Sequence, residues 1–199
     1  MKQVLTIFLC VLFAFLCSIS AASEQAENVP IITDELWLSV YGPMAESGAL
    51  DTNFSIPELA GDDIDARYLL YSLFLVRNSF AETVTVFQDI ADQNPDAVAA
   101  DADNLTTQLQ AFTTETKDLS TSDTLAPVVK KMGAVTGSLA RFIEKTKEIA
   151  PEVRYQEENV DKEAFAAEYL ALLESNEEYE KAVREALTEL QEVSWIPGS

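Results

Sequence analysis

The sequence predicts an all-α protein, a single antiparallel helical bundle of four to five helices with a short N-terminal helical arm. Three observations favour this fold class. From Asp62 onward, apolar residues recur at spacings of three and four, which is the period of an amphipathic helix. No run of alternating apolar and polar residues indicates a strand. The polar links between the periodic segments are short, which favours one domain over two.

Residues 1–22 have the features of a cleaved secretory signal peptide. Lys2 precedes an apolar run over 4–17, and the small residues at 20–22 suit a cleavage site. The apolar run is shorter than the ~20 residues that a membrane-spanning helix needs. We therefore expect the mature chain to have no transmembrane segment and to be secreted or periplasmic.

Residues 23–61 are predicted to form an N-terminal arm and an irregular connection. Within this segment, Thr33 is expected to cap a short helix over 34–41, because acidic residues follow it in the first turn. The helical bundle is then expected to occupy 62–199.

The first three helices of the bundle are predicted over 62–92, 95–119 and 123–149. Asn94 is expected to cap the second of them, with Pro95 in its first turn. The spacing predicts core positions at Leu69, Leu73, Val76, Phe80, Val84, Phe87 and Ala91, then Val98, Ala102, Leu105, Leu109, Phe112, Thr116 and Leu119, then Leu125, Val128, Met132, Val135, Leu139, Phe142, Thr146 and Ile149. Val129 and Ile143 are expected to widen the last of these stripes.

A pair of shorter helices is predicted at the C-terminal end, over 161–174 and 176–193, split near Ser175 and Asn176. Their inward-facing residues are expected to be Phe165, Tyr169, Leu172 and Leu173 on the first helix, and Tyr179, Val183, Ala186, Leu187, Leu190 and Val193 on the second.

The residue types of the mature chain exclude several kinds of chemistry. Removal of 1–22 takes away both cysteines, Cys10 and Cys17, and the chain has no His. Disulfides, thiol nucleophiles, His-based triads, Cys/His zinc sites and His-ligated iron centres are therefore excluded. The sequence also has no Gly-rich phosphate loop and no nucleophile elbow. We predict that the protein is not an enzyme and has no cofactor.

The nearest match to a metal-binding motif is a calcium-loop spacing between Asp51 and Asp62. Its sixth position is Ile56, where a glycine should turn the chain, and its last position is Asp62, where a bidentate Glu is expected. Asp62 more simply supplies negative charge at a helix N-terminus. The sequence therefore predicts no metal ligand.

Acidic residues dominate the charge of the chain. There are 34 Asp and Glu against 13 Lys and Arg, for a net charge of −21, and loss of Lys2 with the signal peptide makes the mature chain one unit more negative. A field of this sign disfavours binding to nucleic acid. Two interpretations remain open, a solvated exterior that keeps an exported protein soluble and a surface for a basic partner.

The first function hypothesis is a non-catalytic protein that acts through protein–protein interaction. On the helix over 123–149, Gly133 and Gly137 fall on the outer side, with Ala134, Ser138 and Ala140 close by. A helical glycine costs about 1 kcal/mol relative to alanine, so two of them need a reason. Small residues four apart let another backbone approach closely. Three interpretations remain open: the two glycines are merely tolerated, another part of this chain packs over them, or they form an interaction face open to a protein partner.

The alternative hypothesis is a carrier of an apolar small molecule or lipid between the bundle helices. Its apolar lining would come from Trp37, Tyr71, Phe74 and Phe80, although the same aromatic residues also suit core packing. Two sequons, which begin at Asn53 and Asn104, are possible glycosylation sites.

Overall fold

The computed structural model describes residues 60, 62–157 and 161–193. This part is 86% helical and contains no strand. Its elements are α4 (Ile64–Ala91), α5 (Pro95–Thr116), the 3₁₀ turn η1 (Asp123–Leu125), α6 (Ala126–Ile149), the 3₁₀ turn η2 (Ala150–Glu152) and α7 (Lys162–Glu192). The predicted all-α helical bundle is thereby confirmed, with four helices among the residues described.

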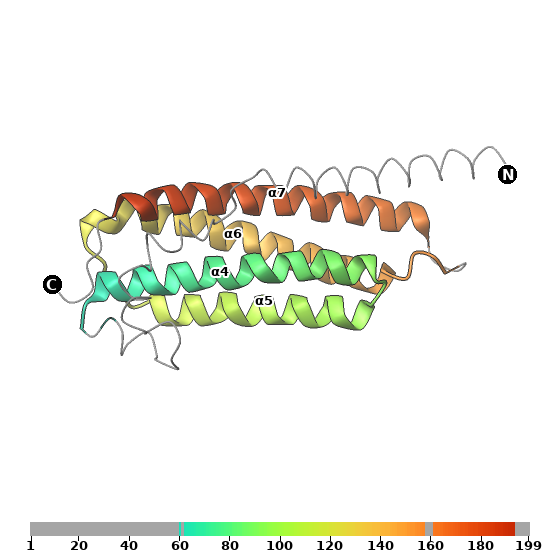
Figure 1. The fold of residues 1–199 in the computed structure, drawn as a ribbon, viewed down its shortest axis with the longest axis horizontal. Helices are drawn as coiled ribbons and strands as arrows, with labels where there is room; N and C mark the ends of the chain where they lie inside the picture. Colours follow the sequence, from blue (N-terminus) through green and yellow to red (C-terminus); the bar gives the residue numbers. More distant parts are fainter. Residues whose placement is uncertain (1–59, 61, 158–160, 194–199) are drawn as a thin grey trace. The chain divides into compact units, whose positions relative to one another are not determined.

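The four helices run alternately up and down (Figure 1). The most extensive packing joins α6 to α7, followed by α4 to α5 and α5 to α6, whereas the backbones of α4 and α7 approach each other at few points. The link between α4 and α5 is short and contains Gln93, whose φ of 55° lies in the left-handed region. An antiparallel bundle with such connections brings residues far apart in the sequence into neighbouring helices.

Three of the helices begin at a side-chain cap. The Asp63 carboxylate accepts a hydrogen bond from the backbone N–H of Ala66 at the start of α4, and Asn94 does the same for Ala97 at the start of α5. Asp161 caps α7 in the same way. Each cap satisfies a backbone donor that the first turn leaves without a partner, so the predicted cap at Asn94 is confirmed.

The C-terminal segment forms one continuous helix, α7, so the predicted split near Ser175 and Asn176 is wrong. The Ser175 hydroxyl donates to the carbonyl of Leu172 at 2.7 Å, and the Asn176 amide donates to the Glu180 carboxylate at 2.8 Å. Both polar side chains therefore find partners inside the helix. Because neither residue is Gly or Pro, neither interrupts the backbone hydrogen bonding.

The apolar stripe predicted for α4 is correct in its first half and wrong in its second. Leu69, Leu73 and Val76 are buried, but Val84 is 46% exposed. In this second half, the hydroxyl groups of Ser79 and Thr83 are buried where apolar side chains were expected. Each hydroxyl donates a hydrogen bond to a carbonyl of its own helix. Beyond Val76 the buried positions of α4 are Ser79, Thr83, Val86 and Ile90.

The eight central positions of the stripe predicted for α6, from Leu125 to Ile149, are all buried. Of the two residues expected to widen it, Ile143 is buried, but Val129 is 36% exposed because it faces the outer side of the helix. On α5, Phe112 is buried as expected, whereas Leu109 is only half-buried, and Asp101 is buried although the sequence pattern did not place it in the core. The α5 helix therefore contributes a charged group to the interior of the bundle.

An aromatic row joins the beginning of α7 to α4 and α6. Neighbouring ring centroids in this row lie between 4.6 and 6.2 Å apart. Ring pairs at such distances add to the free energy gained by burying their area. The row consists, in order of contact, of Tyr155, Phe165, Tyr169, Phe87 and Phe142.

The predictions made for 1–59 lie outside the described residues. They include the signal peptide over 1–22, the short helix over 34–41, Trp37 and Asn53. Among the helices that the structure does describe, none combines the length and the apolar character that crossing a membrane requires.

Candidate interaction surface

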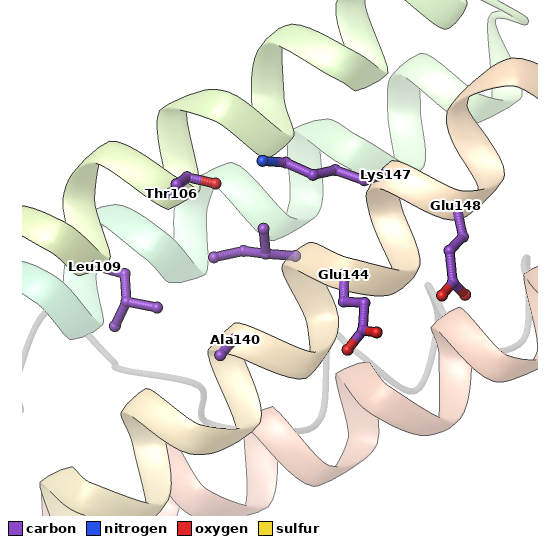
Figure 2. Close-up of a pocket in the computed structure, with 7 residues that line it drawn as sticks. Thr106, Leu109, Ala140, Glu144, Lys147 and Glu148 are labelled. Atoms are coloured by element: carbon purple, nitrogen blue, oxygen red, sulfur yellow. The ribbon is translucent and has the colours of Figure 1, made fainter.

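A surface groove with a volume of about 470 Å³ lies between α5 and α6 (Figure 2). Most of its accessible lining is apolar, with charged side chains toward one end. The lining residues are Thr106 and Leu109 from α5 and Ala140, Ile143, Glu144, Lys147 and Glu148 from α6.

The groove follows from how the two helices pack. Leu105 is fully buried in the bundle, so Thr106 and Leu109 fall at the edge of α5 and stay half-buried. On the α6 side Ile143 is buried, while the short side chain of Ala140 leaves space above it. Because Ala140 is small and lies opposite the half-buried Thr106 and Leu109, an apolar hollow remains that no described side chain fills.

An ion pair links the two helices at one end of the groove. The Nζ of Lys147 lies 3.3 Å from Oδ1 of Asp103 on α5, and Figure 2 shows the Lys147 side chain reaching toward that helix. Both groups are largely exposed, so this pair contributes little to stability. The carboxylates of Glu144 and Glu148 point away from α5 in the same view, and Glu148 forms its ion pair with Lys145 instead.

The structure places the predicted interaction face on the outside of α6. Gly133, Ala134 and Ala140 are exposed and Gly137 is partly exposed. Ser138, expected beside them, is instead buried, and its hydroxyl donates to carbonyls of its own helix. A Cβ built on Gly133 or Gly137 meets no atom within 4 Å, so no described segment packs closely over either glycine. Ala140 also lines the groove, which joins the predicted face to the hollow beside α5.

Val129 extends this surface by one more turn. It is 36% exposed and lies four residues before Gly133, on the same side of the helix. We call Val129, Gly133, Gly137 and Ala140 together the outer α6 face. Sequence reasoning missed the α5 side of the surface, because the spacing assigns Leu109 to the core and does not show which helix lies beside α6.

Of the residues predicted to line a ligand cavity, the three that the structure describes, Tyr71, Phe74 and Phe80, are not among those lining the groove. Tyr71 instead donates a hydrogen bond from its hydroxyl to the Glu115 carboxylate at 3.0 Å, and burial together with this carboxylate raises its pKa. Phe74 and Phe80 are half-buried on α4. The fourth predicted lining residue, Trp37, lies outside the described residues.

The sequon that begins at Asn104 lies within α5. Asn104 is exposed, and its amide donates to the Glu82 carboxylate at 2.9 Å. The next residue, Leu105, is fully buried, and the hydroxyl of Thr106 donates to a carbonyl of its own helix.

Groups of carboxylates arranged to hold a metal ion are absent from the part of the chain that the structure describes. The calcium-loop spacing from Asp51 to Asp62 lies mostly outside that part, and Asp62 itself is exposed beside the Asp63 cap.

Comparison of the chain with protein-family models, with curated proteins and with solved structures finds no match.

Proposed function

We propose that the mature protein is an exported, non-catalytic bundle that acts by binding another protein. The observation that carries this proposal is the outer α6 face, where Cβ atoms added to Gly133 and Gly137 would meet nothing within 4 Å. Ala140 connects this face to an apolar groove. Together they offer a long, shallow apolar surface, the shape that suits a partner helix in a groove.

The chemistry of the surface also indicates which kind of helix would fit. Glycines four residues apart allow a partner backbone to approach closely, so small residues are expected where the two helices meet. The groove is lined by Glu144, Lys147 and Glu148, of which Glu148 is paired with Lys145, and the whole chain carries a net charge of −21. A partner helix with basic residues beside its apolar side would therefore be attracted and correctly oriented.

Native mass spectrometry of the mature protein, isolated from its own source, tests this function. The expected spectrum contains a complex with a second polypeptide. The variant Ala140→Arg, which puts a bulky charge into the groove, should appear without that polypeptide. Thr114→Arg, at an exposed position of α5 outside the groove, is the matched control and should keep it. A single chain that retains a small apolar molecule in all three proteins would contradict the proposal and favour the carrier hypothesis.

Replacing both Gly133 and Gly137 with Ala is expected to stabilise the isolated protein and weaken partner binding. Each change removes the cost of a helical glycine, for a combined gain in the free energy of unfolding of about 1–2 kcal/mol. The new methyl groups meet no described atom, so no clash offsets this gain. Urea unfolding followed by circular dichroism measures the stability, and the mass-spectrometric complex reports the binding.

Thr114→Ala is the control for helix propensity alone, and it should stabilise the protein slightly without affecting the complex. If the double alanine variant were destabilised, a segment must pack closely over the glycines. If it were stabilised with the complex intact, the outer α6 face would not be the contact.

A further inference from the structure

Asp101 is a buried carboxylate in the seam between α4 and α5. It is only 7% exposed, and its Oδ2 atom has no hydrogen-bond partner. A buried, ionised carboxylate without a partner is strongly disfavoured, so the native structure must neutralise this group or pair it. Asp101 takes no part in the outer α6 face or in the groove.

The neighbours that face Asp101 from α4 are themselves carboxylates. Glu82 and Asp89, both half-buried, lie close enough to Asp101 for their negative charges to act on its carboxylate. On α5, Asn104 donates its amide to Glu82 at 2.9 Å, and the adjacent acid Asp103 pairs with Lys147. Among the ion pairs between described residues, none involves Glu82, Asp89 or Asp101.

A proton is the ligand that suits this arrangement. Two carboxylates brought together repel and cannot hydrogen-bond, but one shared proton turns the contact into an O–H···O⁻ bond. Consistent with this, burial first, then Asp89 and then Glu82 raise the pKa of Asp101 to about 7.

We propose that Asp101 takes up a proton from solvent and shares it with Asp89 or Glu82, so that the α4–α5 seam is a pH-sensitive joint. In acid, the protonated Oδ2 donates to a carboxylate oxygen of α4 and holds the two helices together. Near neutral pH and above, loss of the proton leaves mutually repelling carboxylates in the seam, and the pair of helices loosens.

The direction of the pH effect follows from proton binding in the two states. An Asp in the unfolded chain has an ordinary pKa of 3.8, whereas burial and the two acids raise the pKa of Asp101 to about 7 in the folded protein. Between these values the folded state binds more protons than the unfolded state, so stability rises as the pH falls from about 7 toward about 4. Below that range Asp101 is protonated in both the folded and the unfolded state, so its contribution to the free energy of unfolding no longer changes with pH.

The experiment compares melting temperatures of wild type and Asp101→Asn at about pH 5 and about pH 8. The amide resembles the neutral acid, so the variant should melt about 5 °C higher than wild type at the higher pH and similarly at the lower one. Asp103→Asn, a neighbouring exposed acid, is the matched control and should leave the wild-type pH dependence unchanged. An NMR titration of the Asp101 carboxyl carbon should give a midpoint near neutrality that falls in Asp89→Asn.

Three outcomes would overturn the proposal. Equal destabilisation by Asp101→Asn at both pH values would mean that the ionised carboxylate itself supports the fold. The carboxyl carbon of wild type could titrate near the ordinary Asp value. Finally, millimolar Ca²⁺ or Mg²⁺ could raise the melting temperature of wild type but not of Asp101→Asn at the higher pH, which would assign the seam to a cation.

Discussion

Replacing Phe142 with Ala is expected to lower the free energy of unfolding by about 3–5 kcal/mol. Phe142 is fully buried on α6, and its ring centroid lies 6.0 Å from that of Phe87 on α4. It is the inner end of the aromatic row that connects these helices to the start of α7. Truncation removes the buried ring and leaves a cavity that the surrounding helices fill only in part. Denaturant unfolding, followed by circular dichroism, measures the loss.

Leu170→Ala is the matched control, because Leu170 is a large apolar residue on α7 that remains 47% exposed. Its truncation should change the free energy of unfolding by only about 0.5 kcal/mol. Phe142→Leu should retain most of the wild-type stability, since it refills much of the volume. If Phe142→Ala cost no more than the control, the row would not form part of the stabilising core.

The reliability of the sequence pattern varied from helix to helix for identifiable physical reasons. On α6 nearly every core position carries an apolar side chain, so spacing located most of the buried stripe and missed the buried Ser138. On α4 the pattern failed after Val76, because Ser79 and Thr83 occupy the core and satisfy their hydroxyls locally. Small polar residues inside a helix interface look like surface residues in any hydrophobicity count.

Tertiary packing accounts for the other features that the sequence did not predict. Heptad counting placed Gly133 and Gly137 on the outside of α6, where the structure also has them. The groove needs a second helix beside α6, and nothing in the α5 pattern marks Leu109 as its lining. The burial of Asp101 could not be predicted from the sequence either, because it depends on the packing of α4 and not on the residues of its own helix.

The second large effect is expected at Tyr179, where α7 meets α4. Tyr179 is fully buried, and its hydroxyl lies 2.6 Å from the hydroxyl of Ser79. Ser79 donates its own proton to the carbonyl of Leu75, so the Tyr179 hydroxyl must be the donor and the Ser79 oxygen the acceptor. Burial raises the pKa of Tyr179, so this proton is retained at physiological pH. The pair is a polar link between two helices whose backbones otherwise approach at few points.

Tyr179→Ala is therefore expected to lower the free energy of unfolding by about 3–5 kcal/mol, as for other large aromatic truncations.

Two smaller changes separate the contribution of the Tyr179 hydroxyl from that of its ring. Tyr179→Phe leaves Ser79 bonded to Leu75 and should cost about 1 kcal/mol, whereas Ser79→Ala strands a buried phenol donor and should cost about 1–3 kcal/mol. Combining Ser79→Ala with Tyr179→Phe removes the stranded donor, so the double variant should be more stable than Ser79→Ala alone. Urea unfolding of the four proteins of this cycle measures the coupling. A larger loss for Tyr179→Phe than for Ser79→Ala would reverse the assigned direction of the hydrogen bond.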